Sequence, residues 1–257
     1  MEIRLLKSSF DDDGSASNRQ HTACFVINGA AAFDAGSLAM AIGADRENVR
    51  DIVLSHTHLD HIAGLPLFVD DLFSTLRSPI RVHASLTMIE ALRAHIFNDV
   101  IYPNLEEIEN DIGRELELRQ YDNEREIRDA DGSILQDDEN HKEPSAGFII
   151  SDAAGSIVLT GDTADTAAIW GAAAQRKDLR AIVVECAFPE SMSKLAATAR
   201  HLTPLGLKAE IEKLDRGEVP VYVANIKPIF RERVIAEIEE LGLSNVRIFP
   251  VGGVISV

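Results

Sequence analysis

Three histidines and one aspartate fall within six residues in the first half of the chain: His56, His58, Asp60 and His61, in the string His-Thr-His-Leu-Asp-His. Neutral imidazole and ionised carboxylate are the groups that zinc and similar divalent ions accept as ligands. Because alternate residues of an extended chain point to the same side, His56 and His58 can reach a single ion. Four ligand-type side chains at this spacing favour a metal site over a polar loop with chance histidines.

The segments on either side predict how this run is positioned. Residues 51–54 form an apolar stretch of strand length, and residues 62–76 form a mostly apolar stretch of helix length. We therefore expect the histidines at the end of a buried strand, with Asp60 and His61 at the mouth of a helix.

Ligand-type residues also stand beside other predicted strands. They are His141, Asp162, Glu185 and His201. The end of a strand is where a sheet presents functional groups to a crevice. Taken alone, Asp162 could merely shape a Gly-Asp turn, but together with the first run its carboxylate is well suited to bridge two cations.

Strand-length and helix-length patterns alternate along the chain. We expect strands at 2–7 (an edge strand), 22–28, 30–33, 51–55, 80–83, 147–151, 156–160, 180–186, 219–224, 246–249 and 254–257, and helices at 37–43, 62–76, 86–97, 166–176, 205–214 and 229–241. Ser85 and Thr203 are predicted N-caps, and Pro204 is expected at the first position of its helix. This alternation in two similar halves predicts an α/β protein with layered sheets.

Composition sets further bounds. The 257 residues are 46% hydrophobic, which fits one layered domain or two small ones. The formal net charge of −17 disfavours a nucleic-acid polymer as partner, because such binding depends on clustered lysine and arginine. No stretch approaches the roughly 20 apolar residues that span a bilayer, and the start does not read as a signal peptide. Cys24 and Cys186 lie in apolar runs and are expected as buried thiols, so we expect a cytoplasmic protein.

The run from residue 56 to 66, His-x-His-Leu-Asp-His-Ile-x-Gly-Leu-Pro, resembles the metal-binding signature of the metallo-β-lactamase superfamily and, within it, the class II cyclic-nucleotide phosphodiesterases. The resemblance extends over most of the chain. The other matching segments are 34–36, 95–98, 102–104, His141 with 147–148, 161–162, 185–189, 200–204 and 225–228.

This resemblance implies a four-layer αββα sandwich formed by one domain, 1–257, with a helical and charged insertion around 85–140. It implies two divalent metal ions, zinc before others, a cyclic nucleotide as the small-molecule partner, and a possible homodimer. The metal ligands carried over from the family are His56, His58 and His141 at the first ion, Asp60 and His61 at the second, and Asp162 bridging both. Asp34 would fix the ligand loop.

One position departs from the family pattern. Asn225 stands where these enzymes have a final histidine, in the string Asn-Ile-Lys-Pro. An amide oxygen is a weaker ligand for zinc than imidazole, so the second site could be weak, empty or selective for Mn²⁺ or Mg²⁺. His21 could compensate, although an ordinary residue at a strand start is the simpler interpretation.

The mechanism expected from the resemblance is hydrolysis of 3′,5′-cyclic AMP or GMP by a metal-bound hydroxide, with Asp60 among the catalytic residues. His201, oriented by Glu185, would protonate the departing sugar oxygen. The aromatic residues Phe97, Tyr102 and Phe188 could form a wall for the base or simply belong to the core.

Two other interpretations stay open. The chain could be a different hydrolase of the same superfamily, such as an RNase Z-like phosphodiesterase, a lactonase or a thioesterase. It could also be a catalytically impaired metal-binding homologue, because Asn225 replaces a ligand histidine.

Overall fold

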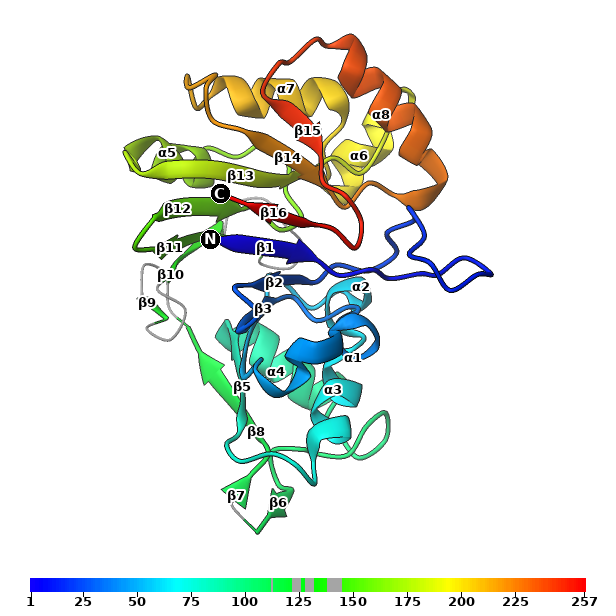
Figure 1. The fold of residues 1–257 in the computed structure, drawn as a ribbon, viewed down its shortest axis with the longest axis vertical. Coiled ribbons are helices and arrows are strands. Elements are labelled where there is room, and N and C mark those ends of the chain that lie inside the picture. The colour runs from blue at the N-terminus through cyan, green and yellow to red at the C-terminus, as the bar shows by residue number, and fades with distance from the viewer. Residues whose placement is uncertain (112, 122–125, 128–131, 138–144) are drawn as a thin grey trace.

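Two facing sheets with helices on their outer sides form the fold in the computed structural model (Figure 1), which describes residues 1–111, 113–121, 126–127, 132–137 and 145–257. The described part of the first sheet has the strand order β16 (Val254–Ser256), β1 (Glu2–Leu5), β2 (Phe25–Ile27), β3 (Ala31–Phe33), β4 (Asp51–Val53), β5 (Ile80–Ala84) and β8 (Leu116–Gln120). The second has the order β15 (Val246–Ile248), β14 (Val221–Ala224), β13 (Leu179–Glu185), β12 (Gly155–Leu159), β11 (Ser145–Asp152), β10 (Gly132–Asp137) and β9 (Glu126–Ile127).

Helices cover each sheet on the side away from the other. Over the first sheet lie α1 (Leu38–Ala41), α2 (Leu59–Ile62), α3 (Leu65–Leu72) and α4 (Leu86–His95). Over the second lie α5 (Ala168–Gln175), α6 (Ser193–Ala199), α7 (Pro204–Glu212) and α8 (Arg231–Glu240). A small hairpin, β6 (Glu109–Asn110) with β7 (Gly113–Arg114), stands apart. The predicted four-layer αββα sandwich is confirmed.

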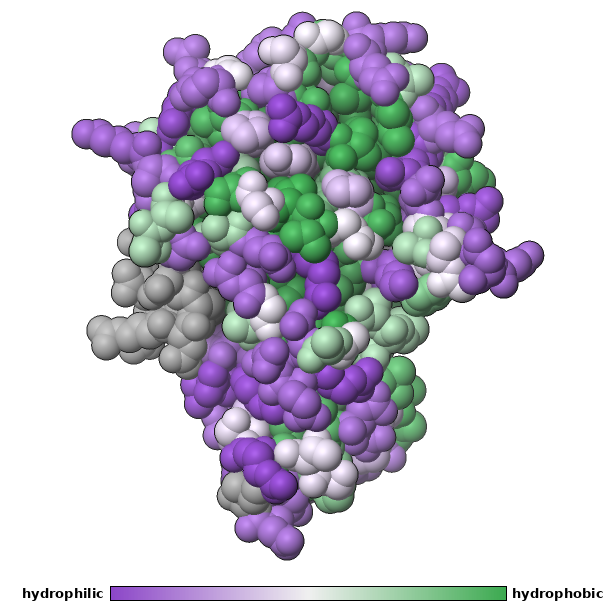
Figure 2. Space-filling model, viewed as in Figure 1, coloured by the Kyte–Doolittle hydropathy of each residue, from purple (hydrophilic) through white to green (hydrophobic). Residues whose placement is uncertain are grey.

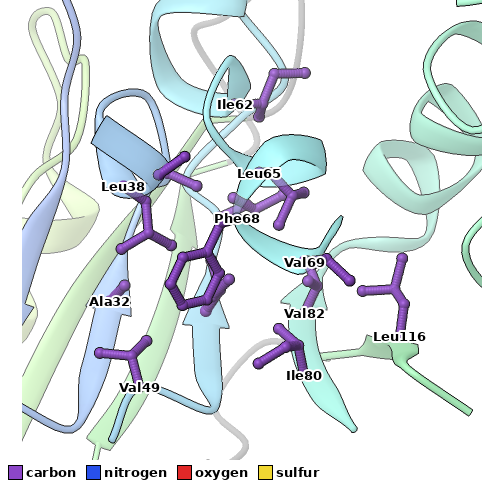
Figure 3. Packing of buried hydrophobic residues seen from close by; sticks show 14 of the residues in the cluster. Ala32, Leu38, Val49, Ile62, Leu65, Phe68, Val69, Ile80, Val82 and Leu116 are labelled. Atoms are coloured by element: carbon purple, nitrogen blue, oxygen red, sulfur yellow. The ribbon is translucent and has the colours of Figure 1, made fainter. Parts of the chain in front are cut away.

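Apolar side chains fill each of the three spaces between these layers. Figure 3 shows the space under α3, where the fully buried Phe68 lies among Leu38, Ala32 and Val49. Between the sheets, aromatic rings meet edge-on, and the ring centres of Phe33 and Phe148 are 5.3 Å apart. Burial of large apolar side chains supplies the main driving force for this arrangement. On the outside, polar residues cover most of the outline of the face in Figure 2, including the projecting loop after β1.

The predicted helix 62–76 is interrupted, and the break positions the site. The chain forms α2 and α3 with Ala63 and Gly64 between them. Gly64 donates a backbone hydrogen bond of 3.0 Å to the carbonyl of Ala35. A Cβ on Gly64 would lie 2.6 Å from that carbonyl oxygen, so only glycine lets the loop 34–36 approach this closely.

The predicted edge strand at the N-terminus is wrong in its position. β1 pairs on one side with β2 and on the other with β16, which comes from the far end of the chain. The hydrophobic pattern of a strand does not reveal a partner so distant in sequence. The N-caps Ser85 and Thr203 are confirmed, because their hydroxyls accept backbone hydrogen bonds from Met88 and Gly206.

The stretch 85–140 begins with α4, and its described remainder forms strands and loops. β8 lies at the edge of the first sheet and β9 and β10 join the second. A single domain with an insertion here stays a prediction. Cys24 and Cys186 are free and buried, as predicted. Among the described residues, no helix is both long enough and apolar enough to cross a membrane.

Candidate active site

The first histidines come shortly after β4, an interior strand of the first sheet. His58 has an extended backbone and stands just before α2, so His56 and His58 alternate as expected. The Nε2 atom of His56 lies 3.0 Å from the Nδ1 atom of His58. Two ligands of a tetrahedral zinc ion with bonds of about 2.0–2.1 Å lie about 3.3 Å apart, so this spacing fits a shared cation.

Asp34, at the end of β3, holds this ligand loop in place. Its Oδ1 accepts hydrogen bonds from the backbone N–H of Ser55 at 2.8 Å and from the Ser55 hydroxyl at 2.9 Å. Its Oδ2 lies 2.7 Å from Nδ1 of His61. Since Nδ1 of His61 is engaged by Asp34, its Nε2 faces the second sheet as a candidate ligand atom.

Asp162 brings the second sheet to the same point. It follows β12 and is buried, and its Oδ2 lies 3.4 Å from Nε2 of His61 and 3.8 Å from Nε2 of His56. The preceding Gly161 has a φ of +63°, and a Cβ there would lie 3.0 Å from the carbonyl of Ala146. The Gly-Asp turn is therefore both a tight turn and the source of a candidate ligand, and His56, His61 and Asp162 form one possible metal-binding group.

Charges in this group are strongly coupled. Burial alone would lower the pKa of His61, but the carboxylates of Asp162 and Asp34 outweigh it and raise that pKa well above its ordinary value. Burial opposes ionisation of Asp162, yet the neighbouring imidazoles keep its pKa well below the usual range. A cation at this position would replace the proton on His61.

His201 and Glu185 form a second pair beside Asp162. Nδ1 of His201 lies 2.7 Å from Oε1 of Glu185, at the end of β13. Burial lowers the pKa of His201, but the Glu185 carboxylate outweighs this effect and raises it overall. The same oxygen accepts a hydrogen bond of 3.1 Å from the backbone N–H of Thr163. The ring of Phe188 packs on the imidazole, with centres 5.5 Å apart. Glu185 thus orients the ring through Nδ1, and in the described part of the chain no hydrogen bond engages Nε2 of His201.

Asn225 is turned so that its oxygen faces away from the histidines. Its backbone N–H donates to Oε1 of Gln20 at 3.1 Å, which fixes the orientation of the Gln20 amide. Gln20 in turn donates from Nε2 to Oδ1 of Asn225 at 2.7 Å. The Asn225 amide nitrogen then donates to Oδ1 of Asp162 at 3.2 Å. In this network Asn225 acts as a hydrogen-bond donor to Asp162, and Gln20 had no signal in the sequence that pointed to this role.

His61, Asp162, His201 and Asn225 line one cavity of about 170 Å³. Its lining comprises Gln20, His21, Thr22, Ala23, Asp60, His61, Asp162, His201, Asn225, Lys227 and Pro228. The Nζ atom of Lys227 lies 3.6 Å from Oδ2 of Asp60 and offsets part of the negative charge. A second possible metal-binding group among the described residues consists of Asp162, Glu185 and His201. His21 is exposed and lines the cavity, but it belongs to neither group.

Some predicted residues lie elsewhere. His141 falls outside the described residues, so its place is open. Phe97 and Tyr102 belong to the apolar cluster behind the first sheet, which corrects the idea that they form a wall for a base. Neither residue lines the cavity of about 170 Å³.

Comparison with known proteins defines the class. A family model described as the beta-lactamase superfamily domain matches residues 31–221. The chain therefore belongs to the beta-lactamase superfamily, and it is a hydrolase with the metallo-β-lactamase fold.

A curated relative and solved structures refine the likeness. Over 217 residues the chain is 26% identical to a probable 3′,5′-cyclic-nucleotide phosphodiesterase of Yersinia pestis, a match that covers 73% of this chain and 60% of that protein. Unliganded yeast PDE1 superposes with a TM-score of 0.75 at 18% identity, covering 100% of this chain and 99% of that one. The metallo-beta-lactamase fold protein YhfI of Bacillus subtilis superposes with a TM-score of 0.72 at 14% identity, covering 99% of each chain. The short form of human tRNase Z superposes with a TM-score of 0.60 at 15% identity, covering 100% of this chain and 99% of that one.

Proposed function

We propose that this chain is a metal-dependent phosphodiesterase that hydrolyses 3′,5′-cyclic nucleotides. The observation that carries the proposal is that His56, His61 and Asp162, which come from two sheets, meet with the His201–Glu185 pair beside one cavity. The similarity to a probable cyclic-nucleotide phosphodiesterase supports the choice of substrate.

The donor atoms fit divalent cations. His56, His58 and Asp162, with His141 from the family pattern, would hold the first ion, and soft imidazole nitrogens favour zinc there. Asp60, His61 and Asp162 would hold the second, where carboxylate oxygens favour a harder ion such as Mn²⁺ or Mg²⁺. Such cations would polarise the phosphoryl oxygens and lower the pKa of a water molecule.

The side chains of the protein would supply the proton for the leaving group and hold the site in position. Water supplies the oxygen that bonds to phosphorus, and the bond from phosphorus to one sugar oxygen breaks. His201, held by Glu185 through Nδ1, presents Nε2 to the cavity and gives its proton to the departing sugar oxygen. Asp162 keeps the two halves of the site at a fixed spacing, and Lys227 balances the charge of Asp60.

The test is turnover of cyclic AMP and cyclic GMP by purified protein with saturating Zn²⁺, Mn²⁺ or Mg²⁺. We expect nucleoside monophosphate as product and complete loss of turnover with a chelator. His201→Gln should lower kcat by about 10²-fold or more while metal content stays unchanged. Absence of turnover with every metal would overturn the proposal, and a panel of RNA 3′ ends, lactones and thioesters would then identify another hydrolase.

A second candidate function follows from the orientation of Asn225. If the Asn225 amide leaves the second site with too low an affinity to hold a cation, the chain is a metal-binding homologue that does not hydrolyse cyclic nucleotides. Metal content measured by mass spectrometry, combined with the same turnover assay, separates the two candidates. A metal-binding homologue would contain metal but would show no hydrolysis.

A further inference from the structure

A larger cavity opens beside the candidate active site. It has a volume of about 910 Å³ and lies between the loop that follows β1 and the beginning of α8. In Figure 1 this loop, in dark blue, projects below the orange end of α8. His21 and Pro228 line both this cavity and the smaller one that holds Asp60 and Asp162. A ligand whose phosphate binds cations held by Asp60 and Asp162 would therefore extend past His21 and Pro228 into the larger cavity.

Four charged side chains line this larger cavity and make no ion pair or side-chain hydrogen bond with any residue in the described part of the chain: Asp11, Arg19, Arg231 and Glu232. Arg231 is half-buried, and burial lowers its pKa. Arg233, in contrast, lines the same cavity but is paired with Glu237 at 2.9 Å. A partly buried guanidinium without an acidic partner is a donor group available to a ligand.

Because both arginines and carboxylates line the cavity, the ligand must offer hydrogen-bond acceptors as well as donors. Guanine presents acceptors at O6 and N7, which match the guanidinium fork, and donors at N1–H and the N2 amino group, which match a carboxylate. Adenine has an amino donor where guanine has O6. A second phosphate would be repelled by Asp11 and Glu232. The apolar Pro228 and Ile229 in the lining give the flat face of a base a surface to pack on.

We propose that this cavity is a base-binding site that selects guanine, so that the chain hydrolyses cyclic GMP in preference to cyclic AMP. This inference rests on the proposed function. Arg231 donates to O6 and N7 of the base, and Glu232 or Asp11 accepts from N1–H and the N2 amino group. Arg231 is thus a specificity-determining residue, whereas the bond-breaking step stays with the smaller cavity.

The experiment compares kcat/KM for cyclic GMP and cyclic AMP in the metal-loaded protein. We expect a preference for cyclic GMP of about tenfold or more, and we expect Arg231→Ala to remove it by lowering only the cyclic GMP value. Arg231→Lys keeps the charge but lacks the fork, so it should also lose most of the preference. Arg233→Ala is the matched control, since its side chain is already held by Glu237, and the ratio should stay within about twofold of the parent.

Several outcomes would overturn the inference. Equal kcat/KM for both nucleotides, a preference for cyclic AMP, or an equal loss for both in Arg231→Ala would each do so. Loss of the preference in Arg200→Ala alone would place the base in a different cavity, which Arg200 and His201 line. If neither nucleotide is hydrolysed, the proposed function fails, and calorimetry with GMP and AMP still decides the base site. Binding of GMP no tighter than that of AMP would count against it.

Discussion

The two halves of the candidate site are built in different ways. The half that belongs to the first sheet comes from one short run, 56–61, and a single carboxylate, Asp34, holds its loop. The half that belongs to the second sheet collects single residues from three separate strand ends and a helix connection: Asp162, Glu185, Asn225 and His201. The first half offers imidazole nitrogens and the carboxylate of Asp60, and the second offers carboxylates, a histidine paired with Glu185, and an amide.

This difference indicates that the two halves have different roles. A contiguous run fixes ligand spacing through local backbone geometry, so it suits the capture of a cation. Dispersed residues can change one at a time, as the position of Asn225 illustrates. The contrast can be sharpened or broken by substitutions in each half.

The largest effect is expected where the halves meet. Asp162→Ala removes the carboxylate that lies within 4 Å of His56, His61 and His201. Asp34 still faces His61 and Glu185 still faces His201, but the carboxylate between the two halves is lost. We expect turnover of cyclic nucleotide to fall by about 10³-fold or more, with clear loss of bound metal. Elemental analysis and steady-state kinetics check this result. Full metal content with unchanged kcat would mean that Asp162 is only a turn residue.

A smaller effect is expected in the first half, at Asp34, which contacts a candidate ligand and is not itself expected to bind a cation. Asp34→Ala frees the Ser55 backbone and His61 Nδ1, so the ligand loop loses its anchor. We expect metal affinity to fall by about 10- to 100-fold. Competition with a chromophoric chelator measures this affinity. Ser55→Ala, which keeps the backbone contact with Asp34, is the milder control and should fall between the parent and Asp34→Ala.

The pH dependence of metal binding tests the charges of the first half. The pKa of His61 is raised, so below that pKa a cation must displace a proton, and metal affinity should fall as pH falls. One displaced proton gives a slope of about tenfold per pH unit. Calorimetry in buffers of different ionisation enthalpy counts the protons released. Zero protons released below neutral pH would contradict the charge state inferred for His61.

The smallest effect is expected in the second half. Asn225→His supplies an imidazole in place of the amide and should tighten the second cation by about tenfold, once Gln20 no longer fixes the side chain. Metal stoichiometry at limiting metal is the measurement, with Gln20→Ala as the control for loss of the amide contact alone. Unchanged stoichiometry would indicate that another residue already completes that position.

Prediction from the sequence succeeded where the information is local. The run 56–61, the two N-caps and the four-layer class follow from spacing, capping chemistry and the alternation of elements, together with the family resemblance. The broken helix at Gly64 was missed because its cause is the distant carbonyl of Ala35. The pairing of β1 with β16 and the contact of Gln20 with Asn225 were missed for the same reason, since the partners are far apart along the chain. The metal and catalytic roles assigned from the resemblance stay predictions.

Gln20 connects two regions that would otherwise respond independently. Its neighbour Arg19 lines the larger cavity, while its own amide holds Asn225, which in turn contacts Asp162. Coupling free energy between two binding events is reciprocal, so a base that shifts the loop around Arg19 and a cation that shifts Asp162 must alter each other's affinity by the same factor. We therefore expect guanine nucleotide and metal to bind cooperatively, with Gln20→Ala lowering the cooperativity measured when each is titrated in the presence of the other.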